Sequence, residues 1–232
     1  METGNSLVKS KNVLKQVSTP DAPPALGPYS QAIIGGNFVF ISGQLPLRNG
    51  TLLIDEPIED EAYNQLLLCV SKSKRERIKR FHFIEDAKRT LYGELIVRYL
   101  ACNILKVPNN KIIINQNEFG KPFLYGYPNF YFNISHSGAW VVCAISKKAV
   151  GVDVEVIKPI DLSIAERFFS EIEKQNLLKL EDKSQVEFFY DLWTLKESYI
   201  KCRGKGLSIA LNSFSIVINN QTVQIMPVSM PL

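Results

Sequence analysis

Residues 151–155 read Gly-Val-Asp-Val-Glu, and a further valine follows at 156. Side chains along a strand point alternately to its two faces, so this pattern predicts a strand over 151–157 with valines on one face and Asp153 and Glu155 on the other. The two carboxylates would then stand roughly 7 Å apart at their Cβ atoms. Oxygen ligands of this kind suit Mg²⁺. Judged by spacing alone, however, a strand with two solvated acids on its exposed face is a better interpretation than a metal site.

The second informative segment is WTLKESYIKCRGKGL, residues 193–207. Its periodicity belongs to a long helix over 185–203, on which Glu197 and Lys201 lie one turn apart and share a face with Trp193. Pairs at this spacing are commonly helical salt bridges. The functional alternative adds a third carboxylate to the acids at 153 and 155, and a lysine for a phosphate that the metal also touches.

A third candidate is NISHSG, residues 133–138, where His136 has a serine on each side at an expected hairpin turn. A nucleophilic serine with a histidine base is poorly supported, because no G-x-S-x-G elbow is present. His136 and the serine hydroxyls could instead contact a phosphate. The remaining alternative is a turn histidine that bonds only to its local hydroxyls.

Charge is unevenly distributed along the chain. Residues 55–61 hold five acids and no base, whereas residues 72–80 hold six bases and one acid. Such a basic run is usually a solvated helix face. If it binds a ligand, a compact molecule rich in phosphate fits better than an extended nucleic acid, because aromatic stacking residues are not interleaved with the bases.

The composition is that of an ordinary globular protein, with 232 residues, 46% hydrophobic and 22% charged residues, and a net charge of +4. The length allows one large domain or two small ones. No apolar stretch approaches the ~18 residues of a membrane span. The four cysteines form no C-x-x-C pair, which favours reduced, buried thiols and a cytoplasmic protein over disulfides or a zinc site. We expect neither a nucleic acid nor a membrane as partner.

Local patterns predict a mixed α/β chain. Gly35-Gly36-Asn37 is typical of a turn between two short strands. Helical periodicity covers most of 73–105. Ser163 with Glu166, and Ser170 with Glu173, fit capping boxes at the starts of two short helices. The other predicted elements are strands at 52–54, 111–115, 129–135, 139–146, 211–218 and 222–226.

Taken in order, five segments resemble the surfactin-type (Sfp-type) 4′-phosphopantetheinyl transferases of bacilli. They are KSKRERIKRFHFIEDAKRTLYGELIVR, FGKPF, FNISHSGAWVVCAI, GVDVEVIKPI and FFYDLWTLKESYIKCRGKGLS. The resemblance covers about residues 51–216, and the joint occurrence of GVDVE and WTLKESYIK is highly specific. It implies an α/β (α+β) fold of two similar subdomains, at 51–150 and 151–232, with coenzyme A in the cleft between them.

The resemblance also implies an enzyme that transfers the phosphopantetheine arm of coenzyme A to a serine of an apo peptidyl or acyl carrier protein, in the service of surfactin-like lipopeptide synthesis. Glu197 or a water bound to the metal would be the base. By motif match, Asp153, Glu155 and Glu197 take the Mg²⁺-ligand positions, and Lys201 takes the pyrophosphate position. The remaining ligand contacts would be Lys74, Arg77 and Thr90 near the 3′-phosphate, Gly120, Lys121 and Pro122 beside the nucleotide, and Ser135 and His136 on phosphate.

Two departures from the family pattern stand at the ends of the chain. Residues 12–47, with VSTPDAPPALGPYSQAI and GNFVFISGQLPL, are similar to the start of the RidA (YjgF) deaminases, so residues 1–50 form an extension to which no deaminase activity is transferred. After residue 226 the family would add further strands, and the second subdomain is therefore expected to be truncated. The alternative function is a catalytically impaired protein that still binds coenzyme A or a carrier protein.

Overall fold

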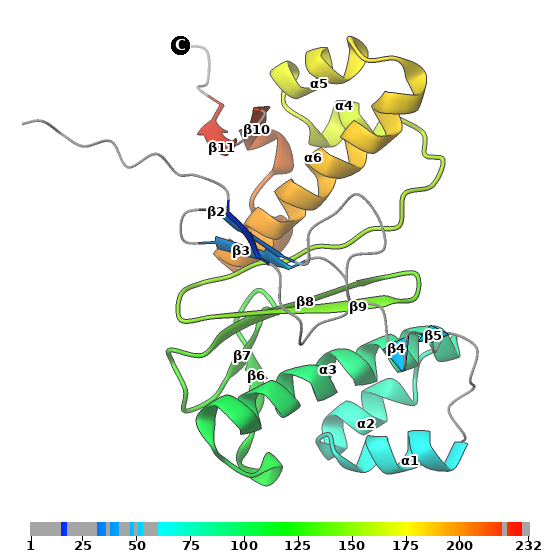
Figure 1. Ribbon diagram of the computed structural model, residues 1–232, viewed down its shortest axis with the longest axis vertical. Helices are drawn as coiled ribbons and strands as arrows, with labels where there is room; N and C mark the ends of the chain where they lie inside the picture. The colour runs from blue at the N-terminus through cyan, green and yellow to red at the C-terminus, as the bar shows by residue number, and fades with distance from the viewer. Residues whose placement is uncertain are drawn as a thin grey trace, which may run out of the picture.

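The computed structural model of the protein describes residues 15–17, 32–35, 38–41, 47–48, 51–52, 60–219 and 222–228. Runs of antiparallel strands and runs of helices follow one another along the chain, which confirms the mixed α/β fold class. In Figure 1, one group of elements lies above the long β8–β9 hairpin and another lies below it. The hairpin itself comprises β8 (Tyr131–Ser137) and β9 (Trp140–Ser146), close to the predicted strands at 129–135 and 139–146.

The lower group packs one long helix against this hairpin. Helix α3 (Ile84–Leu105) contacts both β8 and β9. It buries Leu91, Val97 and Ala101 completely, and the latter two share a core with Phe132 of β8. The other elements of the group are α1 (Asp60–Leu68), α2 (Lys72–Ile78), a 3₁₀ turn (Asn109–Lys111), β6 (Ile114–Gln116) and β7 (Pro122–Leu124).

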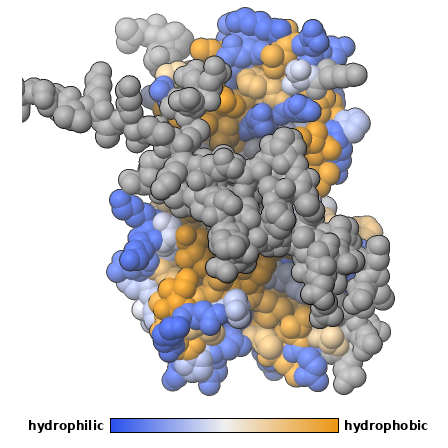
Figure 2. Space-filling model, in the orientation of Figure 1, coloured by the Kyte–Doolittle hydropathy of each residue, from blue (hydrophilic) through white to orange (hydrophobic). Residues whose placement is uncertain are grey.

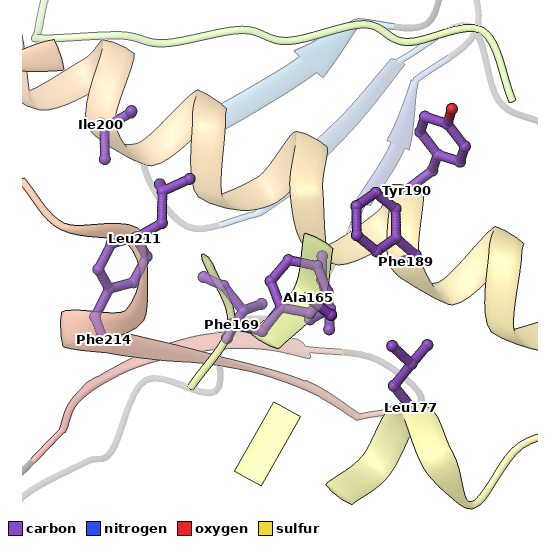
Figure 3. Packing of buried hydrophobic residues seen from close by; sticks show 10 residues of the cluster. Ala165, Phe169, Leu177, Phe189, Tyr190, Ile200, Leu211 and Phe214 are labelled. Carbon is purple, nitrogen blue, oxygen red and sulfur yellow. The ribbon is translucent and has the colours of Figure 1, made fainter. Parts of the chain in front are cut away.

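The upper group has its own apolar core around α6 (Asp182–Arg203), which Figure 3 shows in detail. Phe169, Phe189 and Leu192 are almost fully buried there. The neighbouring elements are α4 (Ile164–Phe168), α5 (Glu171–Leu178), 3₁₀ turns at Gly206–Ser208 and Leu211–Ser213, and the hairpin of β10 (Phe214–Asn219) and β11 (Thr222–Pro227).

The N-terminal segment forms small antiparallel sheets. β2 (Ala32–Gly35) and β3 (Phe38–Ile41) pair with each other, and β1 (Lys15–Val17) adds to the other edge of β2. The turn expected at 35–37 falls mostly on residues 36–37, which lie outside the described part of the chain. β3 lies against β9 of the central hairpin. β4 (Leu47–Arg48) pairs with β5 (Thr51–Leu52), so the strand predicted at 52–54 begins one residue earlier, and residues 53–54 lie outside the described part of the chain.

Several predicted boundaries were wrong for identifiable reasons. The helix expected over 73–105 is two helices, because Phe83 is extended between them (φ −101°, ψ 131°). The first two or three residues of the strands predicted at 111–115 and 211–218 form or adjoin 3₁₀ turns. Ser163 does not cap α4, since it is itself helical. The capping box of Ser170 and Glu173 is confirmed.

The strand predicted at 151–157 was also wrong, and this error concerns the site. The segment carries no backbone ladder. Its alternate backbone N–H groups donate instead to side-chain oxygens of β8, from Val152 to Asn133 Oδ1 (2.8 Å) and from Val154 to Ser135 Oγ (3.3 Å). Val156 continues the series with Ser137 Oγ (3.2 Å). Short polar side chains therefore replace the carbonyls of a neighbouring strand.

The surface combines charged and apolar regions, and Figure 2 shows hydrophobic residues exposed in both halves of the molecule. β6 and β7 and the chain around them expose Ile113, Phe119, Phe123 and Tyr125. All four cysteines are free thiols, but the expected burial is incomplete: Cys69 is exposed and the other three are half-buried. None of the helices in the described ranges is long and apolar enough to cross a membrane.

Candidate functional site

A cavity of about 360 Å³ opens where β8, the extended 151–156 segment and α6 meet. Its lining brings together seven residues of the three sequence motifs, together with Ile134: Ser135, His136, Asp153, Glu155, Trp193, Glu197 and Lys201. The three segments are up to 66 residues apart in sequence. The face shared by Trp193, Glu197 and Lys201 on the helix is therefore confirmed as one wall of the cavity.

The side chain of Asp153 is buried, with 3% of it exposed. Its Oδ1 accepts hydrogen bonds from Ser135 Oγ (2.8 Å) and from the ammonium of Lys201, with which it forms an ion pair. Its Oδ2 is buried and has no hydrogen-bond partner among the described residues. A buried carboxylate oxygen without a donor is costly unless something of positive charge reaches it.

Glu155 and Glu197 complete the acidic lining. Ser137 Oγ donates to Glu155 Oε2 (2.8 Å). Burial raises the pKa of the Glu197 carboxyl above its ordinary value; the Lys201 ammonium opposes this rise, and the charges of Asp153 and Glu155 add to it. A carboxyl with a raised pKa is better suited to accept a proton near neutral pH than an ordinary glutamate.

The donor set fits a hard cation in its chemistry. It offers carboxylate oxygens only, which Mg²⁺ prefers, and the unpartnered Oδ2 of Asp153 is one of them. Within the described ranges, no three His, Cys, Asp or Glu side chains are already drawn together as a metal-ligand group. In this arrangement the Lys201 ammonium supplies positive charge to Asp153.

Gly151 decides how closely the extended segment approaches α6. A Cβ atom added at this glycine would lie 1.9 Å from the Ser198 carbonyl oxygen and 2.4 Å from the Cys202 nitrogen, both backbone atoms of α6. Only a residue without a side chain fits this crossing. The glycine therefore brings Asp153 and Glu155 within reach of the residues on α6.

Gly151→Ala should lower the free energy of unfolding by about 1–3 kcal/mol, the usual cost of overpacking, and transfer of any group at the cavity should slow because the segment must move off α6. Chemical denaturation and activity assays would measure the two effects. Gly126→Ala is the control, since it places a methyl group at positive φ (82°) but meets no atom within 4 Å. Equal, small losses in both variants would contradict the role of Gly151.

The other predicted ligand residues lie outside this cavity. Lys74 is paired with Glu94 (3.2 Å), which also binds Arg98. Arg77 is exposed on α2, and Thr90 is half-buried on α3. Gly120, Lys121 and Pro122 belong to the turn before β7 and its first residue. The structure thus gathers Ser135, His136 and the acids with Lys201, and leaves these six apart.

Lys121 has a structural partner of its own. Its ammonium donates to the carbonyls of Val150 (2.9 Å), Lys201 (2.6 Å) and Cys202 (3.1 Å), and Asn117 of the same loop donates to the Gly204 carbonyl (2.8 Å). Positive charge at the last carbonyls of a helix is stabilising. Burial lowers the pKa of Lys121. The loop therefore fastens the C-terminal end of α6 to the lower group of elements.

Lys121→Met tests whether this lysine serves the helix or a nucleotide. Loss of a charged donor to three carbonyls should lower the stability by about 1.5–3 kcal/mol, while KM for coenzyme A stays within a factor of two or so, roughly the scatter of unrelated substitutions. Arg77→Ala, which removes an exposed charge, is the matched variant. A rise in KM with unchanged melting temperature for Lys121→Met would assign the lysine to the nucleotide instead.

Sequence reasoning missed two features of the site and its support. Asn133 and Ser137 bind the extended segment, and their regular spacing with Ser135 on β8 was the available signal. Lys196 and Glu173 form a fully buried ion pair behind α6. In sequence they look like surface charges, although the lack of polar neighbours on the same helical stripe as Lys196 could have raised suspicion.

Comparisons with known proteins identify the family of the chain. Residues 56–148 match a family model described as "4'-phosphopantetheinyl transferase, N-terminal", and residues 149–227 match the 4'-phosphopantetheinyl transferase superfamily. A third match, to Endoribonuclease L-PSP, covers residues 19–73. The similarity of the N-terminal segment to a second family is thereby confirmed.

Curated relatives extend the match over most of the chain. The 4'-phosphopantetheinyl transferase Sfp of Bacillus subtilis (strain 168) is 42% identical over 165 residues, which is 71% of this chain and 74% of the relative. The transferase gsp of Aneurinibacillus migulanus is 46% identical over 171 residues, 73% of this chain and 71% of the relative. The L-aminoadipate-semialdehyde dehydrogenase-phosphopantetheinyl transferase of Xenopus laevis is 34% identical over 68% of this chain and 57% of its own length. The chain therefore belongs to the 4′-phosphopantetheinyl transferase superfamily of enzymes.

Proposed function

We propose that this protein transfers the 4′-phosphopantetheine arm of coenzyme A to a serine of an apo peptidyl or acyl carrier protein in a Mg²⁺-dependent reaction. The observation that carries the proposal is the single cavity in which Asp153, Glu155 and Glu197 face Lys201 and His136. Negative oxygens for a divalent cation beside two basic side chains suit a pyrophosphate with its counter-ion. Carrier domains of peptide synthetases for surfactin-like lipopeptides are the proposed acceptors.

The three acids would hold Mg²⁺, which supplies charge neutralisation at the phosphate oxygens when bound. Lys201 and His136 would bind the pyrophosphate, with Ser135 as a hydroxyl contact. Glu197, on the wall of the cavity opposite Asp153 and Glu155, would take the proton of the carrier serine. A bond then forms between the serine oxygen and phosphorus, the phosphorus–oxygen bond to the nucleotide breaks, and 3′,5′-ADP leaves. Both reacting atoms are oxygens, so the residues act mainly by positioning and charge.

The nucleotide end is proposed to lie across α2 and α3. Arg77 is exposed there and needs no rearrangement to meet a 3′-phosphate. Lys74 would exchange its contact with Glu94, and Thr90 would offer a hydroxyl. Gly120, Lys121 and Pro122 would form the turn beside the nucleotide; Gly120 and Pro122 would contact it, while the Lys121 ammonium stays bound to the carbonyls of α6. In this arrangement 51–150 and 151–232 act as the two subdomains, 1–50 is an extension, and the enzyme works in the cytoplasm.

Intact-mass analysis of an apo peptidyl carrier domain tests the proposal. Incubation with the protein, coenzyme A and Mg²⁺ should add one phosphopantetheine group to the carrier. EDTA in place of Mg²⁺, and a carrier whose acceptor serine is replaced by alanine, should each prevent the gain. Coenzyme A that raises the melting temperature without any mass gain would instead identify a binding protein, and the proposed transfer would be wrong.

A further inference from the structure

The face of β8 that meets the extended segment carries oxygen-bearing side chains at every second position, Asn133, Ser135 and Ser137. Each accepts the backbone N–H of the residue 19 positions later in the chain. The two serines also donate to the carboxylates of Asp153 and Glu155, each 18 positions later. We call these three residues the β8 side-chain row. It binds both the backbone and the acids of the 151–156 segment.

The direction of the hydroxyl protons follows from the partners. A backbone N–H and a lysine ammonium can only donate. Ser135 Oγ must therefore accept from Val154 N–H and Lys201. Ser137 Oγ must accept from Val156 N–H. A hydroxyl has one proton, and in both serines that proton is left for the carboxylate. Hydrogen bonds to a charged acceptor are stronger than those between neutral groups. Each serine therefore fixes the position of a carboxylate relative to the backbone of the 151–156 segment.

We propose that Ser137 is a positioning residue for Glu155 and, through it, for the divalent cation of the transfer reaction. Its hydroxyl lies 2.8 Å from Glu155 Oε2 and 3.2 Å from Val156 N, so it fixes the side chain and the adjacent peptide together. The hydrogen bond from Ser137 involves Oε2 of the Glu155 carboxylate. The proposal rests on the proposed function, because it assigns Ser137 a part in cation binding at the same cavity.

Ser137 separates this role more cleanly than Ser135 does. Ser135 also accepts from Lys201 (3.1 Å) and is a proposed phosphate contact, so its removal would disturb several interactions at once. Among the described residues, the side-chain hydrogen bonds of Ser137 are confined to Glu155 and Val156. The cavity is lined by Ser135 and Glu155, and the proposed role of Ser137 acts through Glu155 without a direct contact with substrate.

The test compares Ser137→Ala with Ser137→Thr and with Ser146→Ala. Ser146 ends the other strand of the same hairpin, where its hydroxyl accepts the Lys148 N–H. Titration calorimetry with MgCl₂ alone on the full chain should show about tenfold weaker binding for Ser137→Ala, at the lower end of what loss of a partner of a metal ligand costs. Ser137→Thr keeps the hydroxyl and should restore the affinity, and Ser146→Ala should leave it unchanged.

Transfer assays add a readout that a merely structural defect would not reproduce. Ser137→Ala should need about tenfold more Mg²⁺ for half-maximal rate and should approach the wild-type kcat at saturating Mg²⁺. In a Glu155→Gln background, Ser137→Ala should have little further effect, because the charged acceptor is gone. If Ser137→Ala folds poorly, Ser137→Cys is the second variant: its thiol is a weak donor, so Mg²⁺ binding should also weaken.

Wild-type Mg²⁺ affinity in folded Ser137→Ala, or an equal loss in the two backgrounds, overturns the role of Ser137 alone. A wild-type protein that neither binds Mg²⁺ nor modifies the carrier overturns the proposed function and this role with it.

Discussion

Glu173→Ala should destabilise the protein by about 3–5 kcal/mol, the cost of leaving a buried charge without its partner. Glu173 and Lys196 are 1% and 0% exposed, and their charged atoms lie 2.7 Å apart. Total stability of a domain is only about 5–15 kcal/mol, so the variant should unfold at much lower denaturant concentration. The glutamate also accepts the backbone N–H of Ser170 (2.8 Å) and of Ile216 (2.6 Å), tying α5 to β10.

The environment of Lys196 gives this prediction a pH signature. Burial lowers the pKa of its ammonium, and Glu173 counteracts that effect. Without Glu173, folded Lys196 would lose its proton at a lower pH than the unfolded chain does. The unfolded state would then bind more protons, so the stability of Glu173→Ala should rise with pH toward the alkaline range. Denaturation at neutral and alkaline pH measures the slope.

The double variant Glu173→Ala with Lys196→Met is the control. Methionine keeps much of the volume between Phe169 and Phe214, whose rings lie 6.0 and 4.4 Å from the Lys196 ammonium. Removing both charges leaves neither one unpaired. The double variant should therefore be more stable than Glu173→Ala alone. Additive losses would contradict a buried pair that acts as a unit.

Asp153→Asn should reduce carrier modification by roughly a hundredfold to a thousandfold while the protein stays folded. The charge that a metal ion provides in such reactions is worth several kcal/mol, and each ~1.4 kcal/mol changes a rate about tenfold. Asparagine keeps the shape of Asp153 but removes the charge that pairs with Lys201 and would hold the cation. Initial rates at several Mg²⁺ concentrations measure the loss.

Asp161→Asn provides the comparison for this substitution. Asp161 is exposed, and its Oδ1 accepts the Ser163 N–H (2.9 Å), which an asparagine oxygen can also do. It should leave the rate nearly unchanged. Near-wild-type turnover of Asp153→Asn at low Mg²⁺ would show that Asp153 is not a ligand.

The sequence predicted well those elements whose apolar residues recur at a regular spacing because one face of the element is buried. α6 was expected over 185–203 and spans 182–203, because its apolar stripe packs on one core. The β8–β9 hairpin was expected within a few residues for the same reason. Alternation also placed Asp153 and Glu155 toward one cavity, although the segment that carries them is not a regular strand.

What could not be predicted depends on contacts between residues far apart in the chain. The bonds of Lys121 to the carbonyls of α6 span 80 and 81 residues, and no local pattern announces them. The pairing of Lys74 with Glu94 competes with a ligand role in a way that only the packing of α2 on α3 reveals. Lys196 lies on an apolar helical stripe, but Glu173 is 23 residues away in sequence, and only the fold pairs the two charges.

The attachment of residues 151–156 to β8 also determines their register. In an ordinary ladder the hydrogen-bonding groups are the same at every residue, so a strand that slips by two residues loses little of its pairing. Here such a slip would place Ala149 or Asp153 at the crossing where a Cβ atom lies 1.9 Å from the Ser198 carbonyl. Steric exclusion at Gly151 thus selects a single alignment of the segment with β8. This alignment sets how deeply the carboxylates of Asp153 and Glu155 lie in the cavity.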